Sequence, residues 1–427
     1  MPLGDTVLPR SRGRPATTGS SLSPITFQAT VTLAHPSALW HGDRAHERLI
    51  CGALATRLSA VSESRPPAAR HEIDRGRTSF EKLLDAWDGE TAVIQRDRES
   101  DGWMFVCMHS TRLGPAGGGT RMKVYATPAE ALEDAMRLSA AMTRKLAVAG
   151  LPFGGGKAVL AVPLIPSGER RRELLLRYAE LVASLGGTYR TSSDINTNEA
   201  DMDVIGERTE YVFGRSLKAG GSGNPAAPTA LGVFHGIGAS LEYAFGASTV
   251  GGRSVLVQGA GEVGSALAEH LAEAGAALHI ADIDGERARE VAARVGATAI
   301  EASEILDVEC DVFAPCAVGG VLTHDTVGRL RCRVVAGSAN NQIAAPEVAD
   351  RLRARGILYA PDYVINGGGA IALVGLEQLG WSPAELDEAL VRIGATLREI
   401  YDRADHDQIS TAAASDALAD QRLHAAI

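Results

Sequence analysis

Cysteine and long apolar stretches are scarce in this chain of 427 residues, and both shortages exclude whole classes of protein. The five cysteines are too few and too scattered for a disulfide framework, and none of them forms a Cys-x-x-Cys pair. No apolar run reaches the ~18 residues of a membrane-spanning helix, and the N-terminus lacks a signal-peptide pattern. We therefore expect a cytoplasmic protein with reduced thiols and no membrane contact.

Positive charge is also in deficit. The chain has 42 basic and 52 acidic residues, a net charge of −10, which argues against nucleic acid as a partner because phosphates require a basic surface. Only five of the basic residues are lysine. Since arginine carries most of the positive charge, each lysine marks a position where a side chain able to lose its proton could be needed.

The length predicts two to three domains at about 150 residues each. Residues 1–77 are rich in Ser, Pro, Ala and Arg, so we expect an extension that is disordered or loosely attached. A compact pattern begins at Thr78, and Gly223-Asn224-Pro225 resembles an interdomain joint. We expect a first domain over 78–222 and a second over 223–383.

The first compact half contains two glycine-rich stretches. Residues 114–121 carry a glycine run that would let backbone approach another group closely. Thr127-Pro128-Ala129-Glu130 has the capping signature of a helix that would run to Lys145. A second glycine-rich loop is expected over 150–157, followed by a strand over 158–162.

From Ser254 onward, strands and helices alternate, which predicts a parallel sheet covered by helices. The sequence Gly259-Ala260-Gly261-Glu262-Val263-Gly264 fits G-x-G-x-x-G, follows an expected strand and opens an expected helix. Gly259 would make the tight turn, Gly261 would admit the pyrophosphate, and Gly264 would let the helix pack on the strand. The helix N-terminus would then face the phosphates.

Asp282 ends the next expected strand, close to the usual spacing of about 20 residues from the glycines. Its carboxylate would accept a hydrogen bond from the adenosine ribose and repel a 2′-phosphate, which favours NAD over NADP. Arg287 and Arg289 are close enough in the sequence that NADP remains an alternative cofactor. The alternative is a domain of the same fold with a degenerate, empty site.

Lys145 and Lys157 flank the second glycine-rich stretch among small and apolar residues. Two lysines in one pocket would lower each other's pKa, so one could bind a carboxylate while the other exchanges protons. The alternative is that both lysines are ordinary charged residues on the protein surface. Asp194 follows an expected strand and could be either a functional carboxylate or a turn residue. Ala158 after Lys157 disfavours a nucleotide triphosphatase loop.

Eight collinear motifs between Thr78 and Tyr401 resemble the leucine/phenylalanine/valine branch of the Glu/Leu/Phe/Val amino acid dehydrogenase family. The motifs are Gly114 to Arg121, Met142 to Lys145, Gly155 to Lys157, Ala200 to Asp203, Gly223 to Pro225, Ala314 to Ala317, Gly337 to Asn341 and Pro361 to Gly368. The resemblance implies a two-domain α/β fold, with an N-terminal substrate domain and a Rossmann dinucleotide-binding domain separated by a cleft. It also implies that a C-terminal helix within 384–427 returns to the first domain, before a polar tail.

The reaction implied is NAD-dependent oxidative deamination of an L-amino acid to the 2-oxo acid and ammonium, and the reverse reductive amination. By the family pattern, Lys145 would bind the substrate carboxylate with Asn366, Lys157 would activate water, and Asp194 would shuttle protons. Gly117, Gly118 and Met142 would line the substrate side. The cofactor would contact Gly259, Gly261, Glu262, Val263, Gly264, Asp282, Thr229, Ala336, Asn340 and Asn366. No metal is expected, and the resemblance favours a homo-oligomer.

Three residues depart from the family pattern in the side-chain pocket. Gly117 is expected to open volume, Phe213 to remove it, and Ser192 to add a hydroxyl group. The missing Lys at position 117 argues against glutamate. The pattern leaves leucine, valine and phenylalanine open, as well as a specialised amino acid of a biosynthetic pathway. A catalytically silent NAD-binding subunit is the rival from another functional class.

Overall fold

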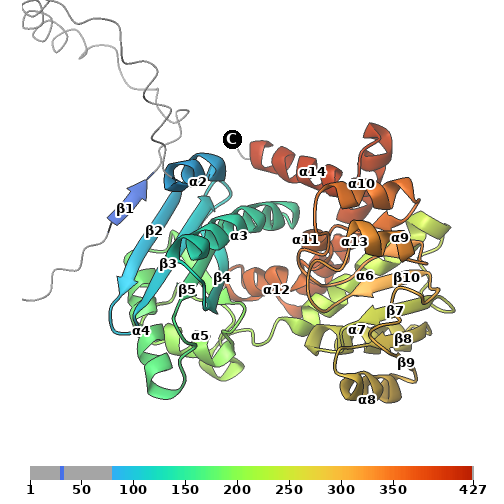
Figure 1. Ribbon diagram of the computed structural model, residues 1–427, viewed down its shortest axis with the longest axis horizontal. Helices are drawn as coiled ribbons and strands as arrows, with labels where there is room; N and C mark the ends of the chain where they lie inside the picture. Colours follow the sequence, from blue (N-terminus) through green and yellow to red (C-terminus); the bar gives the residue numbers. More distant parts are fainter. Residues whose placement is uncertain (1–28, 33–78, 426–427) are drawn as a thin grey trace, which may run out of the picture.

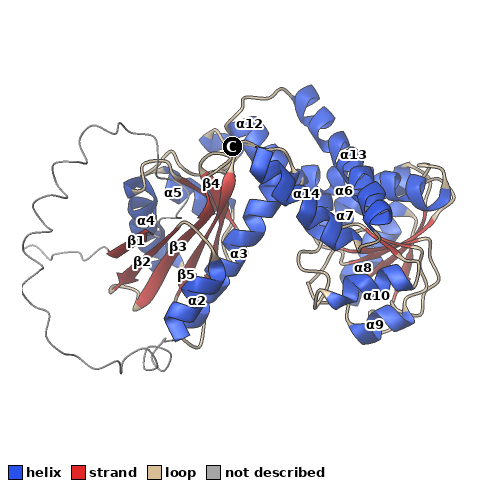
Figure 2. Ribbon diagram, turned by 90° about the horizontal axis from the view of Figure 1, so that it is seen from above, coloured by secondary structure: helices blue, strands red, loops and turns tan. Residues whose placement is uncertain are grey.

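The computed structural model describes residues 29–32 and 79–425, which form two α/β domains (Figures 1 and 2). In Figure 1 the first domain runs from blue to green, and the second from yellow to orange. This arrangement confirms the two-domain fold expected from the motifs. The expectation for residues 1–77 lies outside the described residues, apart from strand β1 (Ala29–Thr32), which pairs with β2.

The first domain is built on a mixed six-stranded sheet in the order β1-β2-β3-β5-β4-β6. Strands β4, β5 and β6 are mutually parallel where they pair, and the remaining pairs are antiparallel. Side chains of β3 alternate between the two faces, because successive residues of a strand point in opposite directions. Phe105 and Cys107 pack under helix α3, whereas Met104 and Val106 pack under α4. The bounds are α2 (Ser79–Trp87), β2 (Thr91–Asp97), β3 (Gly102–Ser110), β4 (Ala116–Lys123), α3 (Pro128–Val148), β5 (Gly154–Ala161), α4 (Gly168–Ser184), β6 (Tyr189–Ser193) and α5 (Glu199–Gly206).

The two glycine-rich stretches are neighbouring strands of this sheet. The loop expected over 150–157 is therefore shorter than predicted, because β5 already begins at Gly154. A Cβ at Gly118 would lie 1.8 Å from the carbonyl oxygen of Gly156, and one at Gly155 would lie 2.1 Å from the backbone nitrogen of Thr143. The glycines thus let β4, β5 and α3 approach one another more closely than side chains would allow.

The second domain holds a parallel sheet in the order β12-β11-β10-β7-β8-β9. Counted from β7, this is the doubly wound order of dinucleotide-binding domains, and the chain reverses direction across the sheet between β7 and β10. The carboxyl ends of these two central strands mark the place where such sheets bind ligands. The bounds are α6 (Ala226–Phe245), β7 (Ser254–Gln258), α7 (Glu262–Glu273), β8 (Ala277–Ala281), α8 (Gly285–Val295), β9 (Thr298–Ile300), β10 (Val312–Pro315), α9 (His324–Arg329), β11 (Val334–Val335), α10 (Glu347–Ala354) and β12 (Leu358–Tyr359).

The C-terminal segment links the two domains. Helices α11 (Asp362–Ile365), α12 (Gly368–Glu377) and α13 (Pro383–Asp407) lead to α14 (Thr411–Ala425), which packs against α3 of the first domain. The polar tail expected beyond Asp402 is helical, comprising the end of α13 and all of α14. Ala414, Leu418 and Ala419 of α14 are buried, and in Figure 2 the helix lies between the domains. Among the described residues, no helix is both long and apolar enough to cross a membrane.

The close approach of β5 to α3 predicts a strong effect of Gly155→Ala on stability. The new Cβ would overlap the backbone of Thr143, so α3 would have to shift, and overpacking of this kind costs about 1–3 kcal/mol. Gly238→Ala in α6 is the matched control, because its Cβ would meet only Ser248 at an ordinary 3.6 Å. Urea unfolding should show a lower midpoint for Gly155→Ala only. Equal midpoints for the two variants would contradict this account.

Candidate active site

A cavity of about 470 Å³ opens between the two domains. Its first-domain wall comes from the segment after β6, and its second-domain wall comes from the interdomain joint, α6 and the start of α7. The lining residues are Ser193, Thr197, Asn198, Glu199, Gly214, Gly223, Asn224, Pro225, Ala226, Thr229, Glu262 and Val263. The cleft expected between the domains is therefore present.

An ion pair between Lys157 and Asp194 lies on the first-domain side. The Nζ of Lys157, on β5, is 3.1 Å from Oδ1 of Asp194, which follows β6. Lys157 is only 5% exposed. The other oxygen of Asp194 accepts a 2.8 Å hydrogen bond from Nε of Arg121, on β4. Three adjacent strands thus bring one carboxylate and two cations together.

Burial and neighbouring charges shift the pKa values of this pair. Burial lowers the pKa of Lys157, Asp194 opposes that change, and the charge of Arg121 lowers the pKa further. Burial would raise the pKa of Asp194, but Lys157 and Arg121 outweigh it and hold the pKa below its ordinary value. The result is a carboxylate that stays ionised beside an ammonium group that gives up its proton more readily.

Lys145 reaches across the cleft from α3. Its Nζ donates a 2.6 Å hydrogen bond to Oδ1 of Asn366 in the second domain. The amide nitrogen of Asn366 in turn donates to the side-chain oxygen of Asn340 and the carbonyl oxygen of Ser338. Burial lowers the pKa of Lys145 to about 8; the charge of Asp362 opposes this, and that of Lys157 adds to it. The charge of Lys157 thus favours the neutral form of Lys145.

The nucleotide loop has the geometry that its glycines predict. Gly259 adopts a φ of +104°, and a Cβ there would meet the backbone of Ala317 at 2.8 Å. A Cβ at Gly264 would lie 1.9 Å from the carbonyl oxygen of Gly259, whereas the space beside Gly261 is open. Asp282 accepts a 2.7 Å hydrogen bond from the backbone nitrogen of Ala260, so its carboxylate is fixed at the edge of this loop.

Three of the remaining residues expected at the cofactor side line the cavity, whereas Ala336 does not. Thr229 and Val263 line the cavity, and so does Glu262, whose carboxylate accepts a 2.9 Å hydrogen bond from Asn224 of the interdomain joint. Ala336 follows β11 and is fully buried. Glu262 places a negative charge at the N-terminus of α7, where the resemblance puts the pyrophosphate.

The expectation that Gly117 opens volume is wrong. A Cβ at this position would already be 3.3 Å from the ring of Phe153 and 3.7 Å from Leu146, so the space is filled. Phe153 and Phe213 pack edge to face with ring centroids 5.7 Å apart. Met142 is half-buried and packs against the same core. The ring of Phe153, which packs on Phe213, therefore occupies the space beside Gly117.

Sequence reasoning missed the network behind Asp194. Arg121 also donates to Oδ2 of Asp134 at 2.8 Å, and the hydroxyl group of Tyr125 donates to the same oxygen at 2.7 Å. These contacts join β4, α3 and the loop between them, so no local spacing rule reveals them. The one available signal was that Arg121 ends the first glycine-rich motif.

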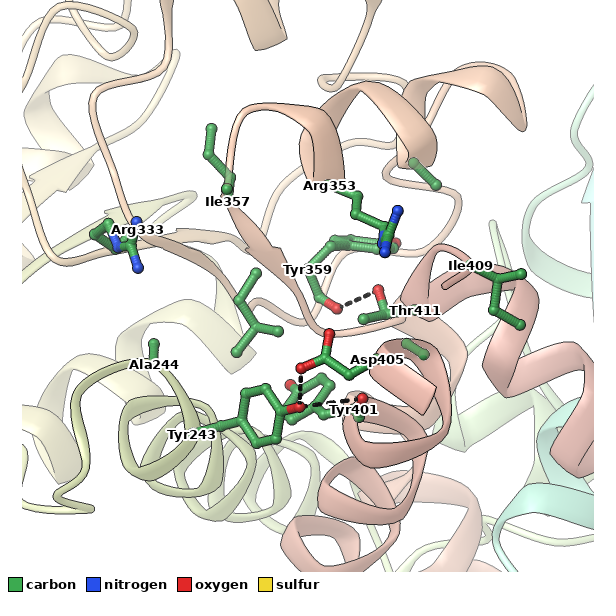
Figure 3. Close-up of a pocket in the computed structure, with 14 residues that line it drawn as sticks. Tyr243, Ala244, Arg333, Arg353, Ile357, Tyr359, Tyr401, Asp405, Ile409 and Thr411 are labelled. Carbon is green, nitrogen blue, oxygen red and sulfur yellow. Dashed lines mark hydrogen bonds between the residues drawn. The ribbon is translucent and has the colours of Figure 1, made fainter. Parts of the chain in front are cut away.

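A second cavity of about 230 Å³ lies at the outer edge of the parallel sheet, beside β12 (Figure 3). The hydroxyl group of Tyr243 donates to Asp405 and to the carbonyl oxygen of Tyr401, and Thr411 donates to the carbonyl oxygen of Tyr359. None of the residues expected at the active site lines this cavity. Several residues expected to bind the cofactor line the interdomain cavity instead.

Family models cover most of the chain. The model for the Glu/Leu/Phe/Val dehydrogenase dimerisation domain matches residues 95–211, and the Glutamate/Leucine/Phenylalanine/Valine dehydrogenase model matches residues 277–427. The chain belongs to this family of amino acid dehydrogenases. The resemblance seen in the eight motifs is thereby confirmed.

Individual relatives agree with this assignment. The chain is 40% identical to leucine dehydrogenase of Geobacillus stearothermophilus over 80% of its own length and 92% of the relative. It is 43% identical to valine dehydrogenase of Streptomyces virginiae, over 78% and 93% of the two chains. The crystal structure of L-tryptophan dehydrogenase from Nostoc punctiforme superposes with a TM-score of 0.71 at 36% identity, covering 81% of this chain and 99% of the other.

The coupling between the two lysines can be measured by titration. We expect carbon NMR of the reductively methylated protein to show one lysine signal that titrates with a midpoint near pH 8. This signal should be absent in Lys145→Met. Lys157→Met should raise that midpoint, because it removes a neighbouring positive charge, and Asp194→Asn should lower it. Lys123→Met, on the exposed end of β4, is the control. An unchanged midpoint in Lys157→Met would mean that the lysines do not share a pocket.

Proposed function

We propose that this protein catalyses NAD-dependent oxidative deamination of an apolar or aromatic L-amino acid, of the leucine, valine or phenylalanine type, and the reverse reductive amination. The observation that carries this proposal is the buried Lys157–Asp194 pair, 3.1 Å apart, together with the hydrogen bond from Lys145 to Asn366 of the second domain. An anion binder, a proton acceptor and a carboxylate are the groups that this reaction requires of the protein.

Lys145 would bind the substrate carboxylate. Its ammonium group has three donors, of which one is directed to Asn366, so donors remain for an incoming anion. A bound carboxylate would favour the charged form of Lys145 and raise its lowered pKa. Gly117, Gly118 and Met142 would lie beside the rest of the substrate, as the family pattern implies.

Lys157 and Asp194 would carry the proton transfers. In its free-base form, Lys157 would take a proton from the water that attacks the imine carbon of the substrate. Asp194, held ionised, would accept a proton from the substrate amine and return it when ammonium leaves. Burial supports both roles, because it excludes bulk water from the groups that exchange protons.

The nucleotide loop and its surroundings fit NAD. A cavity of about 430 Å³ beside Gly259, Gly261 and Asp282 has room for an adenosine, and its rim carries two exposed apolar side chains, Ile283 (96%) and Val318 (76%). We propose that Glu262, Val263 and Gly264 hold the pyrophosphate through backbone groups, with Thr229, Ala336, Asn340 and Asn366 around the nicotinamide. NAD held there would supply the acceptor for the hydride of the substrate carbon.

The substrate pocket supports an apolar side chain. Gly117 replaces the lysine that would bind the side-chain carboxylate of glutamate, and Phe153 and Phe213 lie nearby with their rings buried. Ser192 adds a hydroxyl group that a specialised amino acid could use, so a biosynthetic enzyme of the same fold is the second candidate. A catalytically silent subunit is disfavoured, because it would have no reason to keep a buried lysine beside a carboxylate.

We also propose a cytoplasmic homo-oligomer. The match to a dimerisation domain supports self-association, and the described cysteines Cys107, Cys310, Cys316 and Cys332 are all free, as in a reducing compartment.

The reaction is tested by following NADH formation at 340 nm with a panel of L-amino acids. We expect turnover with apolar or aromatic substrates, and a loss of kcat of about 10²–10⁴-fold in Lys157→Arg, since arginine cannot release a proton. NADH binding, followed by fluorescence, should survive. Lys123→Arg at an exposed position is the control. Substantial activity in Lys157→Arg would remove Lys157 from the mechanism.

Cofactor choice is tested at Asp282. Asp282→Ser removes the charge that would repel a 2′-phosphate, and it removes one of the two carboxylates beside Arg287, which lies 3.9 Å from Asp282 and 3.1 Å from Asp284. We expect the kcat/KM ratio of NADP to NAD to rise about tenfold or more, equivalent to about 1.4 kcal/mol. Asp350→Ser, at an exposed position of α10, should leave the ratio unchanged. A ratio that stays constant in Asp282→Ser would place the ribose elsewhere.

A further inference from the structure

Arg121 lies between two carboxylates that come from different elements. It extends from β4, and its side chain is 13% exposed. Its Nε donates to Oδ2 of Asp194, and one terminal nitrogen donates to Oδ2 of Asp134 on α3, both at 2.8 Å. An arginine fork is planar and rigid, so two simultaneous contacts fix its orientation more firmly than a lysine could.

Asp134 is itself held in place. The hydroxyl group of Tyr125 donates to the oxygen that Arg121 also contacts, and Arg137 donates to the other oxygen at 2.7 Å. Arg137 is 55% exposed and lies one helical turn along α3. The buried contacts of Asp134 therefore face Arg121, while its solvent side faces Arg137.

The two oxygens of Asp194 have separate partners. Oδ2 is taken by Arg121, which leaves Oδ1 for Lys157. A free carboxylate could rotate and exchange its oxygens, but this one is held by a charged donor that is itself anchored at a second carboxylate. The contact thereby keeps the same oxygen directed at the lysine.

We propose that Arg121 is the positioning residue of this active site, holding Asp194 in orientation and in charge state through a chain that ends at Asp134. The inference rests on the proposed roles of Asp194 and Lys157. Arg121 does not touch the reacting atoms; it acts through Asp194.

The charge of Arg121 changes how readily the Lys157–Asp194 pair releases its proton. Alone together in a buried site, Lys157 and Asp194 would stabilise each other's ions, and the lysine would hold its proton. The positive charge of Arg121 lowers the pKa of Lys157 and that of Asp194 together. The pair is thus biased toward a lysine that releases its proton beside a carboxylate that does not capture it. Besides Arg121, the charged groups that face the pair are Asp134 and Lys145, both from α3.

The test compares Arg121→Gln, Arg121→Lys and the control Arg137→Gln, which removes a donor to the same Asp134 without touching Asp194. For Arg121→Gln we expect kcat to fall about 10²-fold, as when a reacting group is misplaced, with little change in NADH affinity. The acidic limb of the kcat–pH profile should move to higher pH, because both pKa values rise when the cation is lost. Arg121→Lys should restore the position of the limb but only part of kcat, and Arg137→Gln should match wild type.

The variant Asp194→Asn distinguishes a failure of the proposed function from a failure of the role of Arg121. If Asp194→Asn keeps full activity, the proposed function of Asp194 and the role of Arg121 fall together. If Asp194→Asn is inactive but Arg121→Gln matches Arg137→Gln in kcat and pH profile, only the role of Arg121 is overturned. A lower kcat of Arg121→Gln with an unshifted acidic limb would also overturn the role of Arg121, because a purely structural loss lowers kcat without moving the limb. Should Arg121→Gln fail to fold, Arg121→Lys decides: a limb at the wild-type pH with reduced kcat supports positioning, and full activity refutes it.

Discussion

The buried ion pair of Lys157 and Asp194 is the constraint on which the rest of the structure depends. Taking two charges out of water costs several kcal/mol per ion, and a pair this deep persists only when its remaining hydrogen bonds are satisfied. Here Arg121 completes the coordination of the carboxylate and places a second cation beside it. The site is therefore costly to fold, and the strands that carry it must be placed closely enough for all three side chains to meet.

The glycines of β4 and β5 meet that requirement. Lys157 follows three glycines on β5, and Gly155 contacts the backbone of Thr143, two residues before Lys145 on α3. Because no side chain separates the strand from the helix, β5 and α3, which carry the two lysines, pack directly against each other. In this fold the glycine-rich motif is a packing device that brings the strand of Lys157 against the helix of Lys145.

Features governed by local rules could be predicted from the sequence. The Thr127 cap, the Gly259 turn and the Asp282 position each follow from a few adjacent residues, and the structure has them. The contacts of Arg121 with Asp194 and of Gly117 with Phe153 join residues far apart in the chain, and they depend on how β4, β5 and β6 align. Spacing carries no information about such alignment, so the filled space beside Gly117 and the network behind Asp194 emerge only from tertiary packing.

The hydrogen bond from Lys145 to Asn366 links the chemistry of the two domains. Since an ammonium group can donate three bonds, a substrate carboxylate can bind Lys145 without displacing Asn366. Glu377 meanwhile ties the interdomain segment to α12 by accepting hydrogen bonds from the backbone of Gly214 and from Ser222. Movement of one domain relative to the other must either preserve these bonds or break them. Under the proposed function, a bound anion would hold Lys145 in its charged form, and the hydrogen bond to Asn366 can persist only in an arrangement in which both domains contact the site.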